Sequence, residues 1–142
     1  MVDVKLALEI KDMYDNKKVV EKPENILKIY EFVKQLSMEN EELQEELEDI
    51  DEFSAQIVIS EPDFKCWIKL GDGKFEYGEG EVGDPSYTLS CRQEIMGGMM
   101  QGEIESTSAY MAGDLTIEGN LQDAITYGEF LSLAMETSRD LG

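Results

Sequence analysis

The sequence contains no histidine, and it has only two cysteines among its 142 residues. Without histidine there are no Ser-His or Cys-His nucleophile pairs, no histidine general base and none of the commonest zinc ligand. Two thiols in a chain whose start has no apolar export signal favour buried, reduced side chains at Cys66 and Cys91 over a disulfide or a redox role. We therefore expect a protein that is not an enzyme, with no metal and no cofactor.

Basic residues and long apolar runs are also scarce. Lys and Arg number 12 against 32 Asp and Glu, so the formal net charge is −20. This charge repels phosphate backbones and anionic surfaces, so we expect no nucleic-acid partner. No apolar run approaches the roughly 18 residues of a membrane span, and the first residues, MVDVKLALEIKDMYD, carry charges where a signal peptide is apolar. We expect a cytoplasmic protein without stable membrane insertion.

The remaining composition suits one compact domain. The chain is 42% hydrophobic and long enough to bury a substantial core. Its patterning changes near residue 53, from helical spacing before that point to alternating strands after it. We therefore expect an acidic N-terminal helical region at residues 1–53, packed on the same domain as a sheet and C-terminal helices at residues 54–142.

Three helices are predicted in the N-terminal region. The first is LALEIKDMY, and the second follows Pro23, a residue that commonly begins a helix. The second helix, ENILKIYEFVKQL, has an apolar stripe that must be buried. Its members are Ile26, Ile29, Tyr30, Val33 and Leu36.

The third predicted helix is strongly acidic. Nine of the fourteen residues from Glu39 to Glu52 are acidic, yet Leu43, Leu47 and Ile50 recur at helical spacing. A docking patch for a basic partner and a divalent cation site are alternatives for this run. A solvated helix face with a narrow apolar edge is favoured, because calcium loops need a glycine turn and oxygen ligands at set offsets that are missing here.

Five short strands are predicted from alternating patterns. They are SAQIVIS, FKCWIKL, KFEYGEG, SYTLSC and DLTIE. The Asp-Gly turn in GDGK favours a hairpin, so the first three strands are expected to form an antiparallel meander. Helices are expected to cover one face of this sheet. Trp67 lies among lysines on the other face, covered by their stems or a loop, or else part of an interface.

The C-terminal part is rich in methionine and in apolar helical residues. Met96, Met99 and Met100 surround a pair of glycines, and methionine suits both irregular cores and sites for varied apolar ligands. Core packing is the default for these residues, with a ligand site as the alternative. The last helix, LQDAITYGEFLSLAMETS, is apolar beyond one stripe and must be covered on more than one side. The expected stripe is Leu121, Ala124, Ile125, Gly128, Leu131 and Met135.

The order of segments from Ser54 to Ala134 resembles the sterol carrier protein type 2-like, non-specific lipid-transfer domain. The resemblance rests on CWIKLGDGKFEYGEG, DPSYTLSC, EIMGGMMQG, SAYMAG, DLTIEG and NLQDAI. It implies an α+β fold, in which five mostly antiparallel strands carry helices layered on one face. It also implies an internal apolar tunnel for fatty acyl, sterol-like or other lipid molecules.

The resemblance also implies a set of ligand-binding residues in the tunnel wall. These are Met96, Met99, Met100, Ile104, Tyr110, Met111, Leu121 and Ile125. None of them serves as an ordinary acid, base or nucleophile, so the predicted function is binding, and transfer, of an apolar lipid-like molecule without chemistry. The alternative is a ligand-free interaction or regulatory module, acting as a subunit or as a dimerisation domain. A homodimer and a partner protein both stay open.

Overall fold

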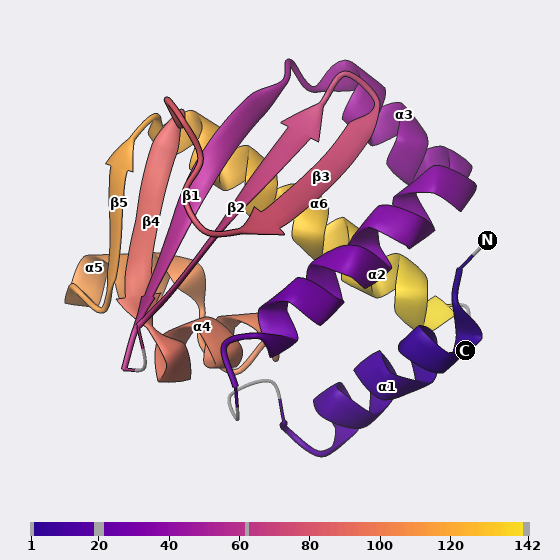
Figure 1. Cartoon of the computed structure of the whole chain (residues 1–142), viewed down its shortest axis with the longest axis horizontal. Helices are drawn as coiled ribbons and strands as arrows, with labels where there is room; N and C mark the ends of the chain where they lie inside the picture. Colours follow the sequence, from indigo (N-terminus) through magenta and orange to yellow (C-terminus); the bar gives the residue numbers. More distant parts are fainter. Residues whose placement is uncertain (1, 19–21, 62, 141–142) are drawn as a thin grey trace.

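The computed structural model describes residues 2–18, 22–61 and 63–140. Within these ranges the chain forms an α+β fold of five strands and six helices (Figure 1). In chain order the elements are α1 (Val4–Asp15), α2 (Asn25–Glu39), α3 (Glu41–Asp49), β1 (Phe53–Ser60), β2 (Phe64–Gly71), β3 (Lys74–Glu79), β4 (Tyr87–Arg92), α4 (Gln93–Met100), α5 (Ser106–Ala112), β5 (Leu115–Gly119) and α6 (Leu121–Asp140).

Local signals in the sequence explain where the N-terminal helices begin and end. The Asp3 side chain accepts hydrogen bonds from the backbone N–H groups of Lys5 and Leu6 at the start of α1. Helix α2 starts two residues after Pro23, as predicted. Asn40 ends α2 and its side chain caps α3. The acidic run is therefore a helix, and its predicted apolar edge is buried at Leu43 and Leu47.

The five strands form one sheet in the order β3-β2-β1-β4-β5. Strands β1, β2 and β3 are the predicted antiparallel meander, and β5 pairs antiparallel with β4. Strands β1 and β4 are parallel, so the sheet is mixed although most of its pairs are antiparallel. The chain reaches β4 through a loop that crosses the sheet after β3 (Figure 1).

Helices cover one face of the sheet, as the sequence predicts. Figure 1 shows α6 running behind the strands, with α2 beside it and α1 packed outside α2. Along each strand, side chains that point toward these helices alternate with side chains on the open face. Ile57 of β1 points toward the helices, together with its neighbours Cys66 of β2 and Leu89 of β4. All three are buried, so the core lies between the sheet and the helices.

The open face of the sheet carries Trp67. This side chain is half-buried and lies against Gly78, since a Cβ atom at Gly78 would be 2.6 Å from its ring. Gln56 fixes the crossing loop there, because its amide donates to the carbonyl of Gly80 and accepts from the N–H of Val82. Trp67 therefore packs on a glycine of the neighbouring strand.

The buried stripe of α6 differs from the predicted one. The structure buries Ala124 and Met135 as expected, but the other core-facing positions are Tyr127, Phe130 and Ala134. Leu121 and Ile125 are 45% and 48% exposed. Large aromatic side chains bury the most apolar surface, so Tyr127 and Phe130 take the positions facing the core and turn Ile125 toward solvent.

Candidate functional site

Aromatic side chains fill the layer between the sheet and the helices α2 and α6. Tyr30 of α2 and Tyr127 of α6 meet there, with their phenolic oxygens 2.7 Å apart. The ring of Phe75 from β3 lies 5.8 Å from that of Tyr30 and 5.9 Å from that of Phe130. The side chains of this layer are mainly apolar, and hydroxyl groups such as those of Tyr30 and Tyr127 supply its polar atoms.

Burial keeps the ionisable groups of this layer neutral. It raises the pKa of Tyr30, Tyr87 and Tyr127 well above the usual range of a phenol. It also raises the pKa of the Cys66 thiol to about 12 and that of the Cys91 thiol to about 11. None of these groups is a base or a nucleophile near neutral pH, so the layer offers apolar contact and neutral hydrogen-bonding hydroxyls.

The methionine-rich segment forms α4 at one end of the sheet. Met96 and Met100 are buried in the core, and Met99 and Ile104 are half-buried beside it. A Cβ atom at Gly98 would lie 2.4 Å from the Cδ1 atom of Ile104, so this glycine is needed for close packing. Four of the eight predicted wall residues are therefore at or beside the core.

The other four predicted wall residues are exposed. Tyr110 and Met111 lie on α5 and are 44% and 82% exposed, and Leu121 and Ile125 lie at the start of α6. Strand β5 separates the two pairs along the chain. The structure does not gather all eight residues around one internal space.

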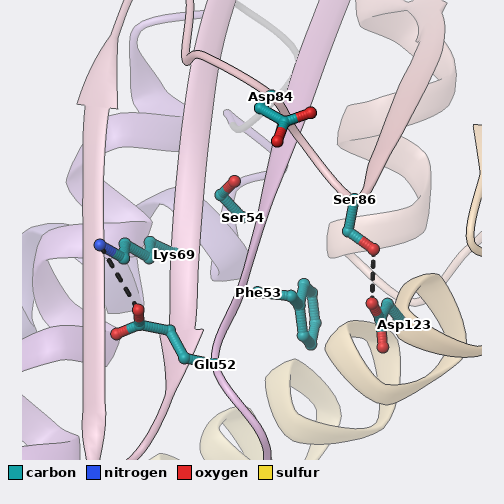
Figure 2. Close-up of a pocket in the computed structure, with 7 residues that line it drawn as sticks. All are labelled: Glu52, Phe53, Ser54, Lys69, Asp84, Ser86 and Asp123. Atoms are coloured by element: carbon teal, nitrogen blue, oxygen red, sulfur yellow. Dashed lines mark hydrogen bonds and ion pairs between the residues drawn. The ribbon is translucent and has the colours of Figure 1, made fainter.

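A hollow of about 390 Å³ lies where β1 begins and α6 begins. Three carboxylates line it, from Glu52, Asp84 and Asp123 (Figure 2). The Lys69 ammonium is 3.5 Å from the Glu52 carboxylate. The Ser86 hydroxyl donates a hydrogen bond to Asp123. The hydroxyl of Ser54 and the ring of Phe53 complete the lining.

A second hollow, of about 480 Å³, lies between α2, α3 and the turn that joins β2 to β3. Leu47, Phe75 and Met38 supply its apolar surface, and Lys34 and Lys74 are also part of its lining. Sequence reasoning missed both hollows. Each combines residues from separate segments, and no motif or spacing in the sequence relates those segments to one another.

Two further findings bear on function. Along the described ranges, no helix combines the length and the apolar character needed to cross a bilayer. Within the same ranges, no three Cys, Asp or Glu side chains are grouped so as to hold a metal ion. The carboxylates of the first hollow are therefore not a ready-made metal centre.

Comparison with known proteins gives one family. Residues 33–132 match the model of the "SCP-2 sterol transfer family". Among proteins with curated descriptions, no sequence matches.

Solved structures with the same fold include three informative neighbours. "UbiJ-SCP2 Ubiquinone synthesis protein" is 13% identical, with a TM-score of 0.61 over 79% of this chain and 96% of its own. Sterol carrier protein 2 from Yarrowia lipolytica, in its apo form, is 15% identical, with a TM-score of 0.61 over 75% and 88%. Palmitated SCP2L2 from Aedes aegypti is 16% identical, with a TM-score of 0.53 over 72% and 90%. At these identities the likeness shows the fold.

Proposed function

The chain belongs to the SCP-2 sterol transfer family, and on that basis we propose that it binds an apolar, lipid-like molecule and transfers it without chemistry. The observation that carries the proposal is the family match across residues 33–132, which includes all five strands. The neutral, aromatic layer between sheet and helices supports it, because such a layer favours apolar contact and, among the described residues, no charged side chain is buried. The palmitated Aedes aegypti neighbour supports a long alkyl chain as the apolar part of the ligand.

The ligand is proposed to occupy the layer beside α4. Met96 and Met100 are the proposed contacts there, because an unbranched thioether side chain adapts its shape to a ligand at small cost. Met99 and Ile104 border the same place. The exposed members of the predicted wall, Tyr110, Met111, Leu121 and Ile125, are proposed to meet a ligand only where it reaches the surface.

The proposal is tested by pairing two buried methionines. Met96→Ala removes a side chain at the proposed site, and Met13→Ala removes one on α1, which packs on α2. Each change is expected to lower the free energy of unfolding by about 2 to 3 kcal/mol. Native mass spectrometry and urea melts with added palmitate or decanol then compare the two variants. Ligand should be retained by the wild type, and it should stabilise Met13→Ala by the same amount as the wild type, because the site is intact in both. Its stabilising effect on Met96→Ala should be larger, because the ligand fills the space that the missing side chain leaves.

A failure of this test takes a definite form. If the freshly purified wild type carries no apolar molecule and gains no stability from either ligand, the protein is not a carrier. If both methionine variants recover equally, the ligand does not bind beside α4.

One observation favours a second candidate function. Tyr30 and Ile57, in the middle of the layer, are fully buried by other side chains, while Leu121 and Ile125 leave apolar surface exposed on α6. We infer from this that a ligand-free interaction module is the competing function, with α6 as its contact. Light scattering tests it: an oligomer that Ile125→Asp converts to a monomer supports the module, and a wild-type monomer contradicts a dimer seam.

A further inference from the structure

The Tyr87 hydroxyl is a buried polar group that makes no hydrogen bond within the described part of the chain. The residue is 1% exposed at the start of β4, on the face that points into the aromatic layer. Leaving a buried hydroxyl unpaired is unfavourable, and phenylalanine would fill the same space without that penalty. The hydroxyl is thus available for a partner that the chain itself does not provide.

Tyr87 lies directly behind the lining of the first hollow. The ring of Phe53, which is part of that lining, is 6.0 Å from the ring of Tyr87. Ser86, the neighbour of Tyr87 in the chain, and Asp123 are also part of the lining (Figure 2). The Asp123 carboxylate is close enough to contribute to the raised pKa of the Tyr87 phenol, after burial and the nearby Tyr127. The Tyr87 side chain therefore lies next to residues that line the hollow.

The charges around the hollow select against an anionic head group. Three carboxylates, from Glu52, Asp84 and Asp123, face one ammonium, from Lys69, so the local charge is 1 − 3 = −2. The single ammonium is already beside Glu52. The whole chain has a net charge of −20, which adds to the repulsion of an anion approaching this mouth.

The inner face of β4 leads from Tyr87 toward α4. Leu89 and Cys91 follow on the same buried face, and α4 with Met96 begins directly after the strand. Four residues of extended chain span about 13 Å, so the buried apolar side chains on this face cover the distance from Tyr87 to the start of α4.

We propose that the hollow at the start of α6 is the entrance for the ligand, and that the Tyr87 hydroxyl hydrogen-bonds a neutral polar head group such as a hydroxyl or a carbonyl. The tail lies along the inner face of β4 toward α4. The preferred ligands are therefore neutral amphiphiles rather than carboxylates. This assignment rests on the proposed lipid-binding function, which it refines by naming the class of head group.

The direct test compares two ligands with the same alkyl chain. Isothermal titration calorimetry at neutral pH measures decanol and decanoate on the wild-type protein, with Nile red fluorescence as a separate report of apolar binding. Decanol is expected to bind about tenfold more tightly than decanoate, because only the carboxylate is repelled at the mouth and loses its hydration inside.

Three variants locate the effect. Tyr87→Phe should weaken decanol about tenfold without lowering stability, because no hydrogen bond within the protein is lost. Tyr77→Phe is the matched control: that phenol is bonded to Glu31 at the edge of the sheet, and decanol affinity should stay unchanged. Asp84→Asn combined with Asp123→Asn should tighten decanoate several-fold and leave decanol nearly unchanged.

The outcomes separate this inference from the proposed function. If decanoate binds as tightly as decanol, or if Tyr87→Phe behaves like Tyr77→Phe, the head-group assignment is overturned while lipid binding stands. If the wild type binds neither amphiphile and no Nile red, the proposed function fails and this inference fails with it. A fall in stability on Tyr87→Phe would show that the hydroxyl has a structural partner, which also overturns the assignment.

Discussion

Breaking the hydrogen bond between Tyr30 and Tyr127 tests the physical picture of the aromatic layer. Both residues are buried and their phenolic oxygens are 2.7 Å apart, so water has no access to replace a lost partner. Tyr127→Phe leaves the Tyr30 hydroxyl unpaired, and Tyr30→Phe does the same to Tyr127. Each single change is expected to lower the free energy of unfolding by about 1 to 3 kcal/mol.

Changing both residues gives a different result. Tyr30→Phe with Tyr127→Phe removes both hydroxyls together, so no buried polar group is orphaned and stability should return to within about 1 kcal/mol of the wild type. Urea melts of the four proteins form a double-mutant cycle. With a slope of about 2 kcal/mol per molar urea, each single variant shifts the midpoint downward by about 0.5 to 1.5 M.

The cycle also gives the result that would refute the reasoning. Additive losses, with the double variant as unstable as the sum of the single ones, would mean that the two phenols stabilise the fold independently. In that case the hydroxyls of the layer would have other partners, and the layer would not be the neutral, closed space described above.

Three further predictions concern other parts of the chain. Burial raises the pKa of the Cys66 thiol from 9.0 to about 12, so the unfolded chain loses this proton at a lower pH than the folded chain does. The free energy of unfolding should therefore fall by about 1.4 kcal/mol per pH unit between those two values. Cys66→Ala should make this dependence on pH shallower in urea melts, and an unchanged dependence would contradict the prediction. Gly119→Ala should lower the melting temperature more than Gly80→Ala does. Both glycines have a positive φ, but only at Gly119 would a Cβ atom meet a backbone oxygen, at 2.4 Å. Equal decreases in melting temperature would argue against this clash. Replacing the exposed glutamates of α3 with glutamine should leave the decanol affinity, measured by calorimetry, within about threefold of the wild-type value. Exposed charges contribute little to a buried apolar site. A tenfold change in affinity would place α3 at the entrance. Those glutamates are Glu41, Glu42, Glu45 and Glu46.

The strands and their order along the chain were predictable because each has a local signal. Alternation with a period of two marks every strand, and the Asp-Gly pair at Asp72 marks the β2–β3 turn. The last helix also has a local signal, because asparagine is a preferred N-cap residue and the Asn120 side chain accepts a hydrogen bond from the N–H of Asp123. The parallel pairing of β1 with β4 has no such signal, because it depends on a crossing loop rather than on either strand.

The site was less predictable for a physical reason. The spacing of apolar residues in α6 allowed more than one buried stripe, and the choice between Ile125 and Tyr127 depended on which side chain fits against Tyr30 across the layer. The entrance is formed by Phe53, Ser86 and Asp123, from three segments that only the folded chain brings together. A family resemblance identifies the fold that performs a function, but these tertiary contacts decide where in the fold it happens.

The central claim is that an apolar molecule binds between the sheet and the helices, and methionine methyl signals report on it most directly. Spectra of protein labelled with ¹³C at the methionine methyl groups are recorded while decanol is added. The account predicts saturable shifts for Met96 and Met100 beside the proposed tail, with Met13 on α1 and the exposed Met38 unchanged. Shifts confined to Met38, or no saturable shift at Met96 and Met100 while decanol binds, would contradict it.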